Sequence, residues 1–493
     1  MARSRAEAFL RIPPFPGHRA PPLAYPGETV VDGAACLALL RQARVGGAFW
    51  NADSDPWAQA EGFEDRGAEL RTGADSELAL VAAILGKPLR LDGPGRFAGC
   101  DGDPAGVLAR ELGAWQYRDP FSGEVIAAGA AIALLAEWRR LIETNRPVRA
   151  VLGVAHWKRV TLDPLLWDGT GAVRHARRAP AVGPAQGPVI AWKSRTPARE
   201  LRRLEVSGTA VAELEDGMIR SPGLGANCVP PLSAIVDFRG VYFDPAGPSD
   251  LEHLLQTAEI GPDLLARAAR LREHLVREAV SKYGAGGAAI ARPPGQTRRV
   301  LVTGQVEDDR SIISGGGGYT NLQLLVRARE IESDAWIIYK PHPDVEAGHR
   351  LGHIPEAQVL AHANEIQRDA PITSLIDSVD ALHVITSLAG FEALLRGKAV
   401  TTHGTPFYAG WGLTHDLAPV PTRRNRTRRL DELVAATLLL YPRYCDPVTR
   451  LPCPAEVVVR RMAAGEAHVS SPLIALREWQ GLLRLALRRL GGR

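Results

Sequence analysis

The sequence has few cysteines, and their placement indicates neither a disulfide framework nor a metal site. There are five in 493 residues, an odd number, and none belongs to a Cys-x-x-Cys pair or lies near a histidine-rich segment. Zinc sites and disulfide-rich secreted domains both need closely spaced ligands or paired cysteines. We therefore expect reduced cysteines, no metal and no cofactor.

Long apolar runs are also missing, although apolar residues make up 45% of the sequence. No segment approaches the roughly 18 uncharged apolar residues that a membrane-spanning helix needs. The first residues, MARSRAEAFLRIPPFPG, lack the apolar stretch and small-residue cleavage site of a secretory signal. The formal net charge of +4 is small and dispersed, which argues against a nucleic acid partner. The sequence thus predicts a cytoplasmic protein that is not integral to a membrane.

From about residue 148, short apolar runs alternate with amphipathic stretches, which is typical of parallel β/α units. A long helical stretch over residues 250–283 ends this region, and the segment GAGGAAIARPPGQ (284–296) indicates a linker. The strands expected beyond it are residues 299–303, 335–339, 381–385 and 399–402. We predict an α/β fold of the GT-B type, with Rossmann-like domains over residues 145–285 and 296–450 facing a cleft.

The first 120 residues resemble a later part of the same chain. At an offset of 311, Ser76, Gly86-Lys87, Gly93 and Ala98-Gly99 match Ser387, Gly397-Lys398, Gly404 and Ala409-Gly410, and Phe97 matches Phe407 one position out of register. The segment Tyr117-Arg-Asp-Pro120 similarly matches Tyr444-Cys-Asp-Pro447. We infer a degenerate partial repeat at the N-terminus, against the alternative of chance similarity between two β/α units.

The richest loop is GQVEDDRSIISGGGGYTN (Gly304–Asn321), which follows a predicted strand and precedes a helix. In an open α/β sheet such loops face the ligand. Asp308 and Asp309 follow Glu307 directly, and adjacent carboxylates suit a nucleophile or a general base. Four glycines permit close approach of the backbone to a ligand. An ordinary acidic turn is the alternative.

Two further strand ends carry groups suited to a nucleotide phosphate. In WIIYKPHPDV, Pro341 and Pro343 flank His342 and forbid helix, while Lys340 supplies a second cation. In ALHVITSLAGFEALLRGKAV, Thr386 and Ser387 stand where a helix begins, and free amides there form an anion site. Glu392, one turn into that helix, is placed to reach a ribose, although a solvated helix glutamate is the more common case.

The segment ELEDGMIRSPGLG (Glu213–Gly225) places Glu215 and Asp216 at a strand end before a glycine. Carboxylates that face a donor site across a cleft are expected to activate an acceptor. Arg220 and Ser221 then suit the binding of an acidic sugar. A hairpin turn at Asp216-Gly217 is the alternative.

With these stretches, and with PSDLEHLL, SKYG and GTPFYAGWGLT, the chain resembles the KpsC/KpsS family of capsular β-Kdo transferases, most closely the KpsC type, over about residues 148–450. It is also similar to bacterial sialyltransferases, which pair an acidic-acidic-Gly motif with a His-Pro motif. The resemblance implies a GT-B fold, CMP-Kdo as donor, no metal, and transfer with retention of configuration to a lipid-linked acceptor in capsule assembly. It further implies that Asp309 is the nucleophile, with Asp308 as the fallback, and that Gln305, His342, Pro343 and Ser387 belong to the donor site.

Typical members carry two transferase modules, whereas this chain has one intact module and part of another, so transfer of a single sugar is the natural expectation. Residues 451–493 are predicted to form a helical basic tail. Its stretch Leu473–Arg493 fits an interfacial helix on the inner membrane face, and packing against the protein is the alternative. The competing functions are a transferase for another CMP-sugar such as sialic acid, and a non-catalytic scaffold that assembles with other capsule proteins.

Overall fold

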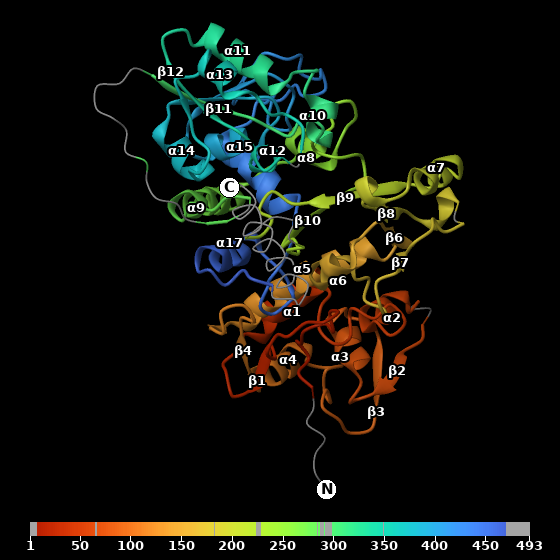
Figure 1. Cartoon of the computed structure of the whole chain (residues 1–493). Coiled ribbons are helices and arrows are strands. Elements are labelled where there is room, and N and C mark those ends of the chain that lie inside the picture. Colours follow the sequence, from red (N-terminus) through yellow and green to blue (C-terminus); the bar gives the residue numbers. More distant parts are fainter. Residues whose placement is uncertain are drawn as a thin grey trace, which may run out of the picture. The chain divides into compact units, whose positions relative to one another are not determined.

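The computed structural model describes residues 7–64, 67–181, 183–222, 228–282, 284–285, 290, 298–348 and 350–469 (Figure 1). Packing divides the chain into two compact units. Unit 1 consists of residues 1–152, 159–189 and 448–452, and unit 2 of residues 153–158, 190–447 and 453–493. Most of the proposed linker and the stretch Leu473–Arg493 lie outside the described residues, and the four-part domain division stays a prediction.

Unit 1 contains two small sheets and six helices among its described residues. The antiparallel sheet has the order β1-β4-β5, and β2 and β3 form a parallel pair. The elements are β1 Ala24–Pro26, α1 Gly33–Ala43, α2 Pro56–Gly62, β2 Leu70–Gly73, α3 Glu77–Ile84, β3 Leu89–Asp92, α4 Pro104–Gly113, β4 Trp115–Arg118, β5 Val125–Ile126, α5 Ala128–Asn145, β6 Ala150–Leu152, α6 Arg159–Leu166 and β7 His175–Ala176.

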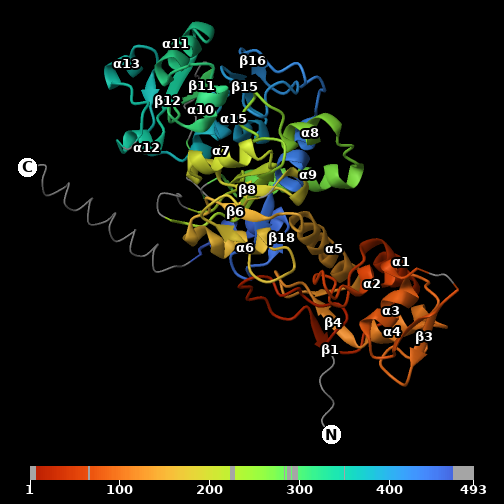
Figure 2. The ribbon, with the colours of Figure 1, turned by 90° about the vertical axis from the view of Figure 1, so that its right-hand side faces the viewer.

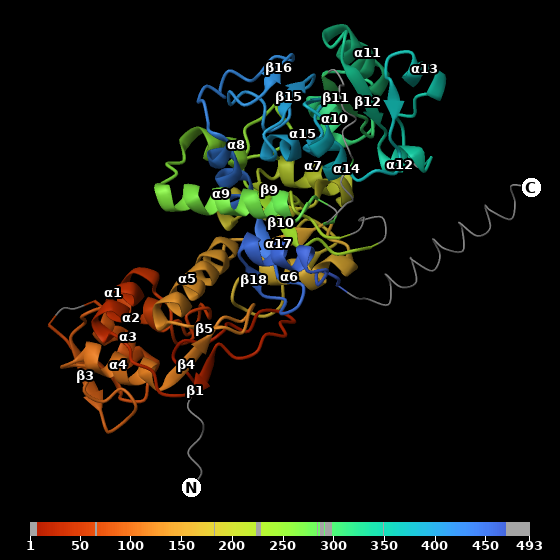
Figure 3. The same ribbon diagram turned by 90° about the vertical axis from the view of Figure 1, so that its left-hand side faces the viewer.

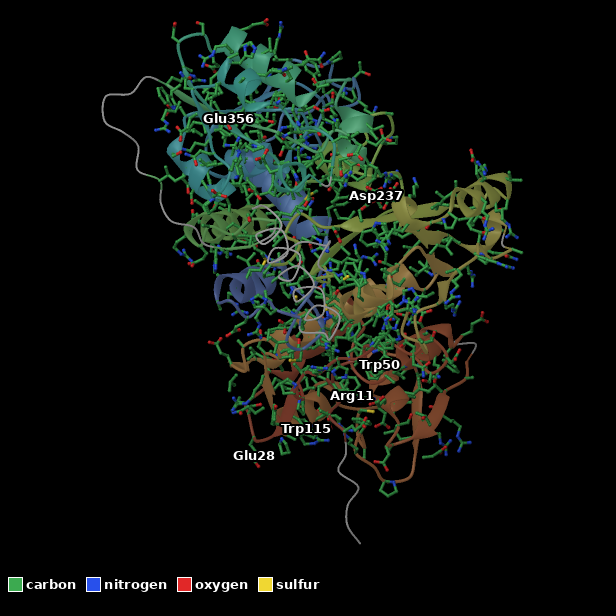
Figure 4. The ribbon with its side chains drawn as sticks, viewed as in Figure 1. Arg11, Glu28, Trp50, Trp115, Asp237 and Glu356 are labelled. Carbon is green, nitrogen blue, oxygen red and sulfur yellow. The ribbon has the colours of Figure 1, made fainter. Side chains whose placement is uncertain are left out.

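Aromatic side chains fill the core of unit 1. Phe15 lies edge-on to Trp138 and Trp167, with ring centroids 5.6 and 5.1 Å apart. The indole Nε1 of the buried Trp138 donates to the carbonyl of Pro452 at 2.8 Å, so its one polar atom is satisfied. Nearer the surface, the guanidinium of Arg11 lies 5.3 Å from the ring centroid of Trp50 (Figure 4).

Unit 2 contains two sheets. In the first, β17 (Arg443–Cys445), β10 (Ser233–Asp237), β9 (Val211–Asp216) and β8 (Val189–Ala191) are consecutive neighbours, and β10 is antiparallel to both β9 and β17. The helices of this part are α7 Ala198–Val206, α8 Asp250–Thr257, α9 Pro262–Arg277, α16 Leu430–Val434 and α17 Ala455–Ala463. The expected single helix over residues 250–283 is wrong: Gly261 and Pro262 begin a new helix, because glycine caps it and proline fits its first turn.

A buried carboxylate joins β10 to α8 and to the C-terminal part of unit 2. Asp237 accepts from the backbone amides of Arg239, Gly240 and Asp250 and from the hydroxyl of Tyr441, the last at 2.6 Å. Figure 4 labels it at the end of this strand. Burial raises the pKa of Asp237, and these four donors offset the cost of burying it.

The second sheet is wholly parallel, with the order β13-β12-β11-β14-β15-β16. Helices α11 and α13 cover one face, and α14 and α15 cover the other (Figures 1 and 3). The elements are β11 Arg299–Thr303, α10 Arg310–Gly315, α11 Asn321–Ile331, β12 Trp336–Lys340, α12 Pro343–Glu346, α13 Glu356–Leu360, β13 Glu365–Ile366, α14 Ile372–Ser378, β14 Ala381–Val384, α15 Leu388–Leu395, β15 Ala399–Thr402 and β16 His415–Asp416. The four strands expected here are confirmed within one residue.

The chain leaves β11 toward β12 on one side of this sheet, and β14 is the neighbour of β11 on the other side. The crevice between the carboxyl ends of β11 and β14 is therefore a topological switch point, where open α/β sheets bind ligands. Figure 2 shows the helices of this sheet from a second direction. Within the described residues, no helix combines the length and the apolar character that crossing a membrane requires.

The segment β2-α3-β3 has the same local geometry as β14-α15-β15. Ser76 and Ser387 each cap their helix by accepting from the amide two residues later, at 3.3 and 3.2 Å. After each helix stands a glycine with positive φ, Gly86 at 70° and Gly397 at 68°. Both strand pairs are parallel. The likeness found in the sequence therefore extends to the caps and turns of the backbone.

We predict that Gly390→Ala in α15 destabilises the protein by about 1–3 kcal/mol, because a Cβ atom there would overlap the hydroxyl of Tyr408. That tyrosine is fully buried and donates to the carbonyl of Ser387, so it cannot swing away. Chemical denaturation measures the effect. The matched control is Gly247→Ala, where nothing lies within 4 Å of the added carbon, and an equal loss in both variants would contradict the explanation.

Candidate functional site

The switch point of the parallel sheet brings two predicted donor-site residues together. Gln305 follows β11 and Thr386 follows β14. The side-chain oxygen of Gln305 accepts from the Thr386 amide at 2.9 Å, and its nitrogen donates to the Thr386 hydroxyl at 3.2 Å. Asn321 accepts from the Gln305 amide and donates to its carbonyl, at 2.8 and 2.7 Å. Buried amides thus fix the crevice beside Ser387, which caps α15.

His342 and Lys340 lie at the end of the neighbouring strand β12. The Nδ1 atom of His342 accepts from the amide of Asp344 at 3.2 Å, and Pro343 occupies the first position of α12. Burial lowers the pKa of His342, so its neutral ring carries its proton on Nε2 and can donate there. Lys340 donates to the carbonyl of Arg368 at 3.0 Å, and burial lowers its pKa.

The two aspartates proposed as nucleophile and fallback are both exposed. Asp309 caps α10, and its carboxylate accepts from the amide of Ser311 at 3.0 Å and from its hydroxyl at 2.7 Å. Asp308 pairs with Arg350 at 3.1 Å. Asp309 is therefore open to substrate while it also stabilises a helix end.

Glu392, predicted to reach a ribose, is buried in the structure. Its buried carboxylate accepts from the amide of Lys282 at 3.1 Å, and burial raises its pKa. The carbonyl of Lys282 in turn accepts from the amides of Arg220 and Ser221, at 3.1 and 3.3 Å. Glu392 thus joins α15 to the segment that follows Asp216, and a ribose contact for it stays a prediction.

Strand β9 separates its acidic residues onto opposite faces, because side chains alternate along a strand. Glu213 and Glu215 share one face, and both contact Arg310, at 2.6 and 2.7 Å. Asp216 lies on the other face. Arg310 follows Asp309 directly, so one arginine joins the loop after β11 to the strand end of the first sheet.

The pKa values of the two carboxylates at the end of β9, Glu215 and Asp216, are shifted in opposite directions. Burial raises the pKa of Glu215 to about 7, although Arg310 opposes the shift. Burial acts in the same direction on Asp216, but Lys158 and Arg220 outweigh it, so that the pKa of Asp216 lies below its ordinary value. At neutral pH the pair therefore offers one carboxyl able to exchange a proton and one fixed anion, the division that acid–base chemistry needs.

Arg220 and Ser221, predicted to bind an acidic sugar, are buried. The guanidinium of Arg220 donates to Asp216 at 2.7 Å, to the Ser221 hydroxyl at 2.8 Å and to the carbonyl of Val229 at 2.9 Å. These contacts hold Asp216 in place. Direct contact of either residue with a sugar stays a prediction.

Lys158 and Arg310 belong to the site but were missing from the predicted set. The ammonium of Lys158 lies 3.1 Å from Asp216. Both had a signal in the sequence, since Lys158 closely follows an apolar run in VLGVAHWK and Arg310 completes GQVEDDR. Their partners are far away in sequence, and no local pattern indicates such pairs.

A hollow of about 450 Å³ runs along α11 past Tyr319 and Arg327, and no predicted site residue lines it. In the part of the chain that the structure describes, no three His, Cys, Asp or Glu side chains converge as metal ligands would. The site is therefore defined by its strand ends and its charges.

The family described as "Capsule polysaccharide biosynthesis protein" matches residues 188–284 and 263–444, together more than half of the chain. Capsule polysaccharide modification protein LipA of Neisseria meningitidis serogroup A is 38% identical over 350 residues, which are 70% of this chain and 49% of LipA. Lipopolysaccharide-processing protein LpsZ of Rhizobium meliloti is 48% identical over 239 residues, 47% of this chain and 54% of LpsZ. The chain spans about half the length of the curated relatives it matches.

Two solved structures are similar to this one. The β Kdo 2,4 transferase of Thermosulfurimonas dismutans KpsC is 31% identical with a TM-score of 0.54, over 64% of this chain and 98% of that one. The β Kdo 2,7 transferase of the same KpsC is 32% identical with a TM-score of 0.51, over 64% and 99%. Together with the two sheets of unit 2, this similarity confirms the predicted α/β fold class of the GT-B type.

We predict that Glu215→Gln becomes more stable relative to the unsubstituted protein as the pH rises. The folded state raises the pKa of Glu215 from 4.5 to about 7. The stability this carboxyl contributes is therefore complete below about pH 4.5 and is lost as the pH passes through 7. The difference in unfolding free energy should grow over that window by at most about 3 kcal/mol.

Denaturant titrations from pH 4 to pH 8 measure this change. Asp216→Asn serves as the comparison, because the pKa of Asp216 is lowered and its stabilising effect is lost only as the pH falls below about 4. The difference in unfolding free energy between Asp216→Asn and the unsubstituted protein should therefore stay constant over this range. A pH-independent difference for Glu215→Gln would show that this carboxyl is not perturbed.

Proposed function

Since the chain belongs to the family of capsule polysaccharide biosynthesis proteins, we propose that it is a glycosyltransferase that adds β-Kdo from CMP-Kdo to a lipid-linked acceptor, with retention of configuration. The observation that carries the proposal is the pair Glu215 and Asp216, one able to exchange a proton near neutral pH and one held ionised. The similarity to two Kdo transferase structures over nearly their whole length supports the choice of sugar.

The donor phosphate binds at the switch point in this proposal. Thr386 and Ser387 offer hydroxyls at the beginning of α15, where the helix dipole favours an anion. His342 is neutral and carries a proton on Nε2, so it can donate to a phosphate oxygen as the bond to the sugar breaks. Transfer of this proton neutralises one charge of the departing CMP, and the proposal includes no metal.

In this proposal retention of configuration comes from two displacements, which need a nucleophile and a group that activates the acceptor. Asp309 is the proposed nucleophile, because its carboxylate is exposed and its neighbour Arg310 contacts Glu215. Glu215, with a pKa of about 7, is the proposed general base that takes the proton from the acceptor hydroxyl. Asp216 adds a fixed negative charge that stabilises the positive charge developing on the sugar ring.

One intact module implies one linkage, so a single Kdo is added in this proposal. A lipid-linked acceptor places the reaction at a membrane surface, and peripheral association with the inner membrane face follows from it.

The test is incubation of the purified protein with CMP-Kdo and a synthetic Kdo-terminated lipid acceptor, with CMP release and product mass as the readouts. We expect a product one Kdo heavier. Asp309→Asn and His342→Ala should each lose about 10²- to 10⁴-fold in rate, the range typical of such groups. Asp308→Asn, the matched control one residue away, should stay close to the unsubstituted protein because Asp308 only pairs with Arg350.

Three other outcomes decide against parts of the proposal. Loss in Asp308→Asn with activity in Asp309→Asn would transfer the nucleophile to Asp308. Turnover of CMP-sialic acid but not CMP-Kdo would keep the transferase and remove the Kdo assignment. Absence of turnover with every CMP-sugar would favour a scaffold.

A further inference from the structure

A short stretch of chain leaves unit 1, joins unit 2 for six residues and returns. Residues 153–158 belong to unit 2, whereas the preceding β6 and the following α6 belong to unit 1. Gly153 begins the stretch with a φ of 74°, and a Cβ atom there would lie 2.5 Å from the Thr196 hydroxyl and 2.7 Å from the Trp192 carbonyl. Only glycine permits both this turn and this close approach. The stretch ends in the 3₁₀ turn η1 (His156–Lys158), whose last residue is Lys158.

The side chain of Lys158 is 6% exposed, and aromatic rings surround its ammonium. The nitrogen lies 3.3 Å from the ring centroid of Trp192 and 5.4 Å from that of Trp157. Such contacts stabilise a cation that has lost most of its water. The ammonium also donates to Asp216, whose Oδ1 is 3.1 Å away.

Asp216 is therefore held from two sides. Lys158 contacts Oδ1, and Arg220 donates from Nε to Oδ2 at 2.7 Å. Lys282 and Glu215 are the other charged groups that act on this carboxylate or on Lys158. Since Arg220 comes from the loop after β9 and Lys158 from the stretch 153–158, the two cations fix both the direction and the charge of the carboxylate.

We propose that Lys158 is a positioning residue for sugar transfer, which holds Asp216 ionised and in a single orientation through its ammonium while Trp157 and Trp192 hold the ammonium. This inference rests on the proposed function, because it gives Asp216 a part in the reaction. Lys158 itself is too buried to contact the substrate, so it acts through Asp216. The stretch 153–158 brings this cation to the end of β9.

Activity as a function of pH tests the proposal with Lys158→Met and Lys158→Arg. Removing this cation raises the pKa of Asp216 and also that of the proposed base Glu215, on which Lys158 acts too, so Lys158→Met should lower kcat by about 10-fold or more and move the acid limb of the kcat profile to higher pH. The KM values should change little. Burial lowers the pKa of Lys158 to about 8, so activity of the unsubstituted protein should fall above that pH. Lys158→Arg should recover much of kcat and keep it above pH 8, because arginine stays charged.

A second measurement needs no activity and separates this inference from the proposed function. In a thermal-unfolding cycle, Lys158→Met should lower the Tm, and the further loss should largely disappear when Asp216→Asn is already present. Lys87→Met is the matched control, a lysine whose ammonium bonds to the Phe63 carbonyl in unit 1, and its effect should not depend on Asp216.

The outcomes are distinguishable. If the unsubstituted protein is inactive but the Tm losses are not additive, the proposed function is wrong, whereas the contact between Lys158 and Asp216 is supported. Additive Tm losses would overturn the inference, and so would a kcat profile of Lys158→Met whose acid limb does not move. An equal loss of kcat in Lys158→Met and Lys158→Arg, with no rescue above pH 8, would show that Lys158 has only a structural role. That result would also overturn the inference.

Discussion

The site depends on the contact of Arg310 with two carboxylates of one strand. Glu213 is buried, and a buried carboxylate is strongly unfavourable without cationic partners. Arg310 at 2.6 Å and Lys193 at 2.7 Å supply them. Because Arg310 stands beside Asp309, satisfying Glu213 also fixes the loop after β11 next to the end of β9. The need to pair the buried carboxylate of Glu213 thus brings the acidic residues of β9 close to those of the loop after β11.

The alternation of a β-strand then determines the chemistry of this strand end. Residues 213 and 215 face Arg310, which they share, while residue 216 faces two cations of its own. On β9, Glu215 and Asp216 contact different cations, so these two neighbouring residues differ in protonation state near neutral pH.

The elements that carry the site were predictable because local patterns determine them. The strands over residues 299–303 and 399–402 follow from apolar runs bounded by turns, and the role of Ser387 as a cap follows from its place before a helix. What the sequence did not indicate were pairings over long distances. Lys158 reaches Asp216 across 58 positions and Glu392 reaches Lys282 across 110, and no periodicity encodes such contacts. The break at Gly261-Pro262 has a local signal, because glycine at a cap and proline in a first turn mark the beginning of a helix.

The segment β2-α3-β3, predicted to belong to a degenerate repeat, keeps the local geometry of β14-α15-β15 without the same neighbours. The helix caps and the glycine turns match those of β14-α15-β15. In the parallel sheet, however, β14 has β11 as its second neighbour, and that strand supplies Gln305 to the crevice. Among the described residues β2 pairs with β3 alone, and Asp75 stands where Thr386 stands in the later copy. A two-stranded sheet has no switch point, so this segment keeps the geometry that stabilises a β/α unit without the second strand that supplies Gln305 in the later segment.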